Sequence, residues 1–517
     1  MQISNLLALP LASGVLASIA AAQTGDLLHQ WNGPSSLDQF GFAVDHVGDI
    51  NGDGHSDLIV GAPEIKPFSR GRTYLYSGRD GSQIRVHRGG GINHNFGNAV
   101  SGIGDVDGDG VGDYVVGATQ TIPGGAGYIR VYSGRTGTEL YQLDGSSGSS
   151  AFGFIIDGVG DINQDGAADF IVGEFLADRN ATDGGSATVF SGADGSKLYR
   201  KNGGTTENWT GISVAGGGDI DGDGVPDFVV GSLGGASGTA NNGTVKSYSG
   251  ATGSLIHEWL SPQAGSNYGC FAADAGDVDA DGFDDVIVGA EFGNAAFVYS
   301  GQTGALILQV DGPIPASKFG NEVSGIGDVN GDGFDDVLVG APDAQIGNKV
   351  EAGAAYLISG QSGDFLFTWE GEAGDQMGNA VSDAGDVNAD GSVDVILGAN
   401  FAIGDKGAAY VYSLNRGLTL EVSTLIAGRP ADISVSSAEP NADVLIGYSL
   451  TGPGPTSTPV GDVSLSLPIE QLPNLRSDAS GAASITVNIP PQVAGASVWL
   501  QAYCAGVLSN GLAETIL

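Results

Sequence analysis

The stretch DVNGDGFDDVLVGA, Asp328–Ala341, decides the fold of this chain. Four aspartates and two glycines are followed at once by a run of apolar, largely β-branched residues that ends at Gly340. Aspartate and glycine favour tight turns, whereas valine and leucine in a short run favour a buried strand. The stretch therefore predicts a β-hairpin whose acidic turn leads directly into a core strand.

The acidic turn occurs seven times, at starts 51 to 58 residues apart, and this regularity indicates a repeat architecture. Each copy has Asp at positions 1, 5 and 9, Asp or Asn at position 3, and Gly at position 6. The seven copies are Asp49–Asp57, Asp105–Asp113, Asp161–Asp169, Asp219–Asp227, Asp277–Asp285, Asp328–Asp336 and Asp386–Asp394.

Each acidic loop stands within a larger repeated unit. An aromatic-glycine pair such as Phe319-Gly320 precedes the loop, and an apolar run ending in glycine follows it, as in Val337–Pro342. The fourth unit has Trp209–Gly211 in place of the pair, and the seventh has Met377-Gly378. Two further alternating strands complete a unit of four short strands, which is typical of one propeller blade. We therefore expect an all-β fold with a seven-bladed β-propeller of four-stranded blades.

The ends of the repeat region indicate how the ring closes. The seventh unit runs through Gly407–Gly417 without a fourth strand, whereas DLLHQW at Asp26–Trp31 resembles the outer strand SLIHEW at Ser254–Trp259. The N-terminal strand is therefore predicted to complete blade seven, which removes two exposed sheet edges.

The acidic loops have the donors that Ca²⁺ prefers, since this hard cation takes about 6–8 oxygen ligands. Positions 1, 3, 5 and 9 offer side-chain oxygens, position 7 offers a backbone carbonyl, and Gly at position 6 permits the sharp turn. The predicted ligands, which allow up to seven Ca²⁺ ions, are Asp49, Asn51, Asp53, His55, Asp57, Asp105, Asp107, Asp109, Val111, Asp113, Asp161, Asn163, Asp165, Ala167, Asp169, Asp219, Asp221, Asp223, Val225, Asp227, Asp277, Asp279, Asp281, Phe283, Asp285, Asp328, Asn330, Asp332, Phe334, Asp336, Asp386, Asn388, Asp390, Ser392 and Asp394. The alternative is a set of hairpin turns that bind nothing, and sevenfold repetition of clustered carboxylates disfavours it.

The repeated unit resembles the FG-GAP repeats that build the N-terminal seven-bladed propeller of integrin α subunits. The resemblance covers residues 24–413 and implies Ca²⁺ between the first two strands of a blade, with ligands on the opposite face. Gly-Ala-Pro is complete only at Gly61–Pro63 and Gly340–Pro342. No integrin-type stalk follows, so the integrin's partner and signalling role do not carry over.

Composition restricts the possible partners. The chain has 517 residues and a formal net charge of −41 with only 19 Lys and Arg, which argues against nucleic acid and anionic lipid as ligands. Residues 1–22 are expected to form a secretory signal peptide, with a membrane anchor as the alternative. The mature chain, with no membrane insertion, is then expected to be secreted, extracellular or at a cell surface, or to reside in a periplasm.

We assign residues 23–415 to the propeller and expect residues 416–517 to form a small β-sandwich. This second domain is either a stabilising accessory or a module that binds carbohydrate or a partner. Cys270 and Cys504 are expected to be free, buried thiols, with a disulfide as the alternative.

The sequence contains no catalytic motif, and calcium binding accounts for its paired carboxylates, so we expect no enzyme. The favoured function is a secreted binding or adhesion module for a protein or glycan ligand. The alternatives are a secreted hydrolase or lyase and a purely structural surface protein. The connections on the face opposite the acidic loops vary in length, and Phe175, Trp209 and Phe401 there are candidate ligand anchors unless they pack locally.

Overall fold

The structure is a computed structural model. It describes residues 25–517 apart from 65, 67, 121–124, 147, 235–242, 415–418, 424, 437–442, 451–455, 459–460, 464–469, 478–482, 490–495, 505–506, 509–511 and 517. The predicted signal peptide, residues 1–22, lies outside the described residues.

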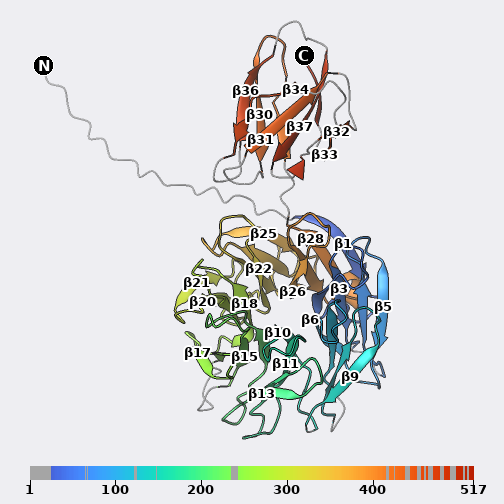
Figure 1. The fold of residues 1–517 in the computed structure, drawn as a ribbon, viewed down its shortest axis with the longest axis vertical. Helices are drawn as coiled ribbons and strands as arrows, with labels where there is room; N and C mark the ends of the chain where they lie inside the picture. The colour runs from blue at the N-terminus through green and yellow to red at the C-terminus, as the bar shows by residue number, and fades with distance from the viewer. Residues whose placement is uncertain are drawn as a thin grey trace, which may run out of the picture.

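Seven four-stranded antiparallel sheets form the blades of a propeller, as the repeats predict (Figure 1). The strands of blades one to three are β2 (Val44–Gly48), β3 (Asp57–Ala62), β4 (Arg72–Tyr76), β5 (Gln83–Arg88), β6 (Phe96–Gly104), β7 (Asp113–Ala118), β8 (Tyr128–Tyr132), β9 (Glu139–Asp144), β10 (Ile156–Gly160), β11 (Asp169–Glu174), β12 (Ser186–Phe190) and β13 (Lys197–Asn202). Those of blades four to six are β14 (Ser213–Gly216), β15 (Phe228–Ser232), β16 (Thr244–Tyr248), β17 (Leu255–Leu260), β18 (Tyr268–Gly276), β19 (Asp285–Ala290), β20 (Ala295–Tyr299), β21 (Leu306–Asp311), β22 (Val323–Gly327), β23 (Asp336–Ala341), β24 (Ala354–Ile358) and β25 (Phe365–Glu370).

Blade seven closes the ring with the N-terminal strand. Its sheet has the order β1 (Asp26–Asn32), β28 (Ala408–Ser413), β27 (Asp394–Ala399) and β26 (Met377–Gly385). Strand β1 pairs antiparallel with β28, with Trp31 opposite Ala409. The Trp31 indole also donates to the carbonyl of Gly81 in blade one at 2.8 Å, and Trp259 makes the same contact with Gly304 at 2.9 Å. The predicted closure and the likeness of the two outer strands are both confirmed.

The aromatic-glycine and Gly-Ala-Pro landmarks meet between neighbouring blades. A Cβ atom added to Gly340 in β23 would lie 2.1 Å from the carbonyl oxygen of Gly378 in blade seven. The same close approach recurs around the ring. Between blades seven and one, a Cβ atom added to Gly398 would lie 2.1 Å from the carbonyl oxygen of Gly41. Glycine is required at these positions because the backbones of adjacent blades pack directly on each other.

The cores lie between blades rather than within them. The second strand of each blade is buried on both faces, as in Asp336–Ala341. One core, for example, joins Leu338 and Trp369 of blade six to Val395 and Leu397 of blade seven. Since each sheet covers its neighbour, the ring is stabilised as a whole.

Two local features differ from the sequence expectation. In blade four the residue equivalent to the buried aromatic is Thr210, since Gly185 bridges Thr210 as Gly127 bridges Phe152. Trp209 therefore stands one position earlier than the aromatic-glycine pattern implies. A four-residue helical turn, α1 (Ala402–Asp405), interrupts the last variable connection, with non-helical dihedral angles at Ile403 and Gly404.

The C-terminal residues form separate small sheets around a core of their own, in agreement with a β-sandwich. Ile433 and Val435 of one sheet share this core with Val444, Ile446 and Leu500 of another. The strands are β29 (Thr419–Val422), β30 (Pro430–Ser436), β31 (Asp443–Ser449), β32 (Thr456–Thr458), β33 (Gly461–Val463), β34 (Glu470–Gln471), β35 (Leu475–Arg476), β36 (Ala483–Asn488), β37 (Ser497–Cys504), β38 (Val507–Leu508) and β39 (Leu512–Thr515).

Cys270 is free and buried, as expected, whereas the Cys504 side chain lies outside what the structure describes. Within the described residues, no helix has the length and apolar character needed to cross a bilayer.

Candidate functional site

The acidic loop of blade five, Asp277–Asp285, brings three carboxylates together. One oxygen from each of Asp277, Asp279 and Asp285 lies within 4.8 Å of the other two. The loops of blades two and four converge in the same way. Their converging residues are Asp105, Asp107 and Asp113, and Asp219, Asp221 and Asp227. The carboxylates at positions 1, 3 and 9 of these loops are therefore close enough together to hold a metal ion.

Hydrogen bonds within the loop hold this shape. In blade five the amides of Asp281 and Gly282 donate to the two oxygens of Asp277, each at 2.9 Å. The amide of Phe283 then donates to Asp281 Oδ1 at 3.0 Å. Gly282 has φ +89°, a conformation that side-chain-bearing residues rarely adopt, so position 6 requires glycine.

The aspartate at position 9 is buried in every blade and ties the loop to the sheet. Asp285 accepts from the amide of Gly301 at 2.9 Å and from that of Val278 at 2.8 Å. Burial raises the pKa of Asp285 to about 7, although these backbone donors oppose the shift and the nearby Asp279 and Asp281 add to it. The seven residues with no exposed surface are Asp57, Asp113, Asp169, Asp227, Asp285, Asp336 and Asp394. A cation beside this carboxylate would favour its charged form.

Position 3 divides the loops into two groups. Aspartate stands there in blades two, four and five, the three blades with converging carboxylates, and the remaining four blades have Asn51, Asn163, Asn330 and Asn388. In blade six Asn330 accepts from the amide of Asp332 at 2.9 Å and donates to Asp336 Oδ1 at 3.3 Å. The amide side chain thus occupies the place of the third carboxylate.

The residues at positions 5 and 7 of the loops make contacts beyond the three converging groups. The position-5 carboxylates are absent from the three converging groups of described residues. Asp109 instead pairs with Arg135 at 3.0 Å, and Asp53 accepts from Ser77 at 3.1 Å. At position 7 the amide nitrogen bonds within the loop, and the His55 ring also contacts the carbonyl of Val387 in blade seven at 2.8 Å.

The residues present fit a divalent cation. Asp219 Oδ1 and Asp279 Oδ1 are buried and have no hydrogen-bond partner among the described residues. A buried carboxylate oxygen without a partner is costly, and a cation in the loop would satisfy it. The donor set is also composed of hard oxygens.

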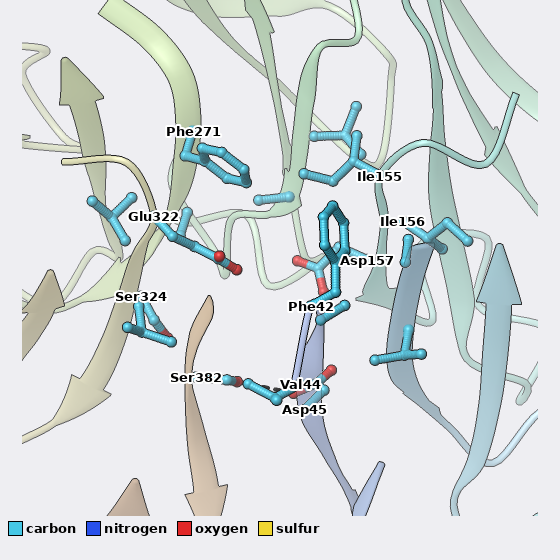
Figure 2. A pocket seen from close by; sticks show the side chains of 18 of the residues that line it. Phe42, Val44, Asp45, Ile155, Ile156, Asp157, Phe271, Glu322, Ser324 and Ser382 are labelled. Carbon is cyan, nitrogen blue, oxygen red and sulfur yellow. Dashed lines mark hydrogen bonds between the residues drawn. The ribbon is translucent and has the colours of Figure 1, made fainter. Parts of the chain in front are cut away.

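A cavity of about 340 Å³ lies where the innermost strands converge (Figure 2). Asp45, Asp157 and Glu322 line it. Asp45 accepts from Ser382 of blade seven at 3.0 Å and from the amide of Gly102 in blade two at 3.1 Å, so it joins three blades.

The cavity carboxylates are perturbed by their surroundings. Burial, and then the charge of Asp45, raises the pKa of Asp157 to about 7. The same two causes raise the pKa of Glu322 well above its usual range. No sequence motif marks these residues, because they come from different repeats.

The variable connections lie at the strand ends opposite the acidic loops. The candidate anchors Phe175, Trp209 and Phe401 are only half-buried, and Phe175 packs on Phe154 at 4.8 Å between ring centroids. More exposed aromatic side chains stand at Phe68 and Phe292, with 76% and 61% of their surface accessible. Sequence reasoning missed these two, since nothing in the pattern distinguishes an exposed phenylalanine from a buried one.

Comparison with known proteins agrees with this geometry. The FG-GAP repeat family matches residues 40–76 and 319–358. Integrin alpha-IIb of Homo sapiens is 33% identical over 172 residues, which are 30% of this chain and 16% of that protein. Integrin alpha-8 of Gallus gallus is 32% identical over 170 residues, and integrin alpha-5 of Xenopus laevis is 30% identical over 224 residues.

The matched segments span only about a sixth to a fifth of these integrins, 16% to 21% of their length, and cover 29% to 39% of this chain. The chain therefore carries FG-GAP repeats and resembles the propeller region of integrin alpha chains.

Proposed function

We propose that this chain is a secreted, calcium-binding propeller that serves as an extracellular binding or adhesion module. The observation that carries the proposal is the convergence of carboxylates at positions 1, 3 and 9 in the acidic loops of blades two, four and five, within an integrin-like FG-GAP propeller. Secretion is supported by the character of residues 1–22.

Calcium is the proposed cation because the loops offer only oxygen donors and Ca²⁺ accepts such donors in variable geometry. Mg²⁺ demands a stricter octahedron and keeps several waters. Positions 1, 3, 5 and 9, with the position-7 carbonyl, are the proposed ligands in all seven loops. An affinity of roughly 10⁻⁴–10⁻³ M is expected for extracellular sites of this kind.

The ligand is proposed to bind the face of variable connections, opposite the calcium loops. In this arrangement calcium stabilises the ring, and the exposed connections provide specificity. The ligand class is a protein or glycan, and no catalytic step is assigned to the chain.

Two measurements test the proposal. Isothermal titration of the EDTA-stripped protein with CaCl₂ should show several binding sites, and MgCl₂ should compete weakly. A panel of immobilised extracellular proteins and glycans, probed in calcium and in EDTA, should give ligands that are retained only in calcium. The proposal would be contradicted if the protein bound no calcium, or if its ligands were retained equally in calcium and in EDTA.

A further inference from the structure

One segment of blade one, whose two ends reach the variable face, has an unusual charge for this chain. Residues 64–96 contain six Lys or Arg and two acidic residues, in a protein with a net charge of −41 and 19 basic residues. Most of the molecule is therefore acidic, whereas this segment of blade one is locally basic. A locally basic segment of this kind favours an anionic partner at that place.

The backbone brings two connections of this segment together. The amide of Phe68 donates to Asn93 Oδ1 at 3.3 Å, and the amide of Asn93 donates to the carbonyl of Ser69 at 2.6 Å. Phe68 is 76% exposed and Ile92 is 46% exposed. An aromatic and an aliphatic side chain thus lie exposed on adjacent connections.

The arginines beside them are incompletely neutralised. Arg72 and Arg88 are directly opposite on β4 and β5, and like charges so placed repel each other. Arg72 pairs with Glu64 at 3.0 Å. Arg70 and Arg88 are exposed, and neither has an ion-pair partner among the described residues. Two guanidinium groups therefore remain available to a ligand.

We propose that Phe68, Arg70, Arg88 and Ile92, here called the arginine–phenylalanine patch, bind an acidic peptide segment of a partner protein in which a carboxylate stands beside an apolar side chain. Arginine pairs with carboxylate in a bidentate geometry, and aromatic and arginine side chains dominate binding energy at protein interfaces. The inference rests on the proposed binding function and assigns a ligand class to it.

An acidic peptide is favoured over the other anionic ligands. An acidic polysaccharide would engage the arginines but would leave aliphatic Ile92 without an apolar contact. A second copy of this chain would bring its own acidic surface into contact with the acidic surface around the patch, which disfavours self-association. At physiological salt the Debye length is about 8 Å, so an acidic peptide would respond to the local basic patch rather than to the distant acidic surface.

The test uses the full chain in CaCl₂ and labelled synthetic peptides. One peptide alternates Asp or Glu with Leu or Phe, and its neutral isostere has Asn and Gln at the acidic positions. We expect the acidic peptide to bind roughly tenfold or more tightly than the isostere, and the double variant Arg70→Glu and Arg88→Glu to lose roughly that factor. Phe68→Ser should weaken binding severalfold.

Matched variants identify the patch as the binding surface. Arg79→Glu, matched to each single substitution Arg70→Glu or Arg88→Glu, makes the same charge change in the β4–β5 turn, where the neighbouring Gly78 amide bonds Asp57 of the acidic loop. Phe292→Ser removes an exposed phenylalanine in blade five. Both should bind like the wild type, and unchanged melting in CaCl₂ should show that all variants fold.

Three outcomes would overturn the inference: equal binding of the acidic and neutral peptides, equal weakening by Arg79→Glu, or patch-dependent binding of polygalacturonate or heparin without peptide binding. If instead a ligand binds another part of the variable face, and does so only in calcium, the proposed binding function holds. The assignment of that function to the patch then fails.

Discussion

The backbone amide of Asp277 in blade five donates to Oδ2 of Asp335 in blade six at 2.8 Å, and the amide of Asp335 donates back to the carbonyl of Asp277 at 3.1 Å. Asp219 and Asp284 form the same reciprocal clasp between blades four and five, at 2.6 and 3.3 Å. In each case position 1 of one acidic loop is held by position 8 of the next. The loops are therefore part of the interface between blades.

The clasp predicts a stability effect for a residue that is not a proposed metal ligand. Asp335→Ala removes the acceptor of the Asp277 amide and should lower the free energy of unfolding by about 1–3 kcal/mol. Denaturant unfolding in CaCl₂ and in EDTA measures this change. Ser56→Ala is the matched control at position 8 of blade one, because the Ser56 hydroxyl has no hydrogen-bond partner. Equal losses in the two variants would refute the role of the clasp.

Ring closure by β1 predicts that the N-terminal strand stabilises the whole propeller. Deletion of residues 26–32 exposes one edge of β28 and should markedly lower the melting temperature. Trp31→Ala, which removes the bond to Gly81 and the stacking on Tyr76, should cost on the order of 2–3 kcal/mol. Unchanged melting of the deletion variant would contradict the closure.

The contact between landmark glycines predicts a steric effect. Gly340→Ala places a Cβ atom 2.1 Å from the backbone oxygen of Gly378, so one blade must move away from the other. We expect a loss of about 1–3 kcal/mol or more in the free energy of unfolding. Gly204→Ala is the control, since a Cβ there meets nothing within 4 Å. Similar unfolding midpoints for both variants would count against direct backbone packing.

The pair of His46 and Asp383 predicts a pH dependence. Their side chains lie 2.8 Å apart between blades one and seven. Burial opposes the charged imidazole, but the charge and hydrogen bond of Asp383, aided by Asp45, hold the pKa of His46 well above its usual 6.5. The charged pair should therefore stabilise the fold fully below pH 6.5, and this contribution should be lost as the pH rises through the higher folded pKa.

Thermal unfolding of the wild type and His46→Gln, compared from pH 6 to pH 9 in CaCl₂, measures this effect. The stability difference between them should shrink as the pH rises. Asp383→Asn should abolish the pH dependence of that difference. A difference that is constant over the range would exclude a role for the charged pair.

The sequence predicts the architecture well because each repeat records it separately. Stretches such as Asp328–Ala341 contain both the turn chemistry and the buried strand, so seven copies specify seven blades. The closing strand is also predictable. Asp26–Trp31 resembles the outer strand of a blade, but the rest of that blade does not adjoin it in the sequence.

Contacts between repeats were not predictable in this way. The clasp of Asp335 and the cavity position of Glu322 depend on how neighbouring blades pack, and no local pattern encodes that geometry. In the fourth unit, where Trp209–Gly211 replaces the aromatic-glycine pair, only the structure shows that Thr210 takes the place of the buried aromatic. The exposure of Phe68 likewise follows from the path of its connection rather than from the residue type.

Melting temperature as a function of calcium concentration tests the central claim most directly. Purified protein is stripped with EDTA and then titrated with CaCl₂ up to millimolar concentration. Because a ligand that binds only the native state stabilises it, we predict an increase of several degrees that excess EDTA reverses. The same melting temperature in EDTA and in millimolar CaCl₂ would contradict the assignment of the acidic loops as calcium sites.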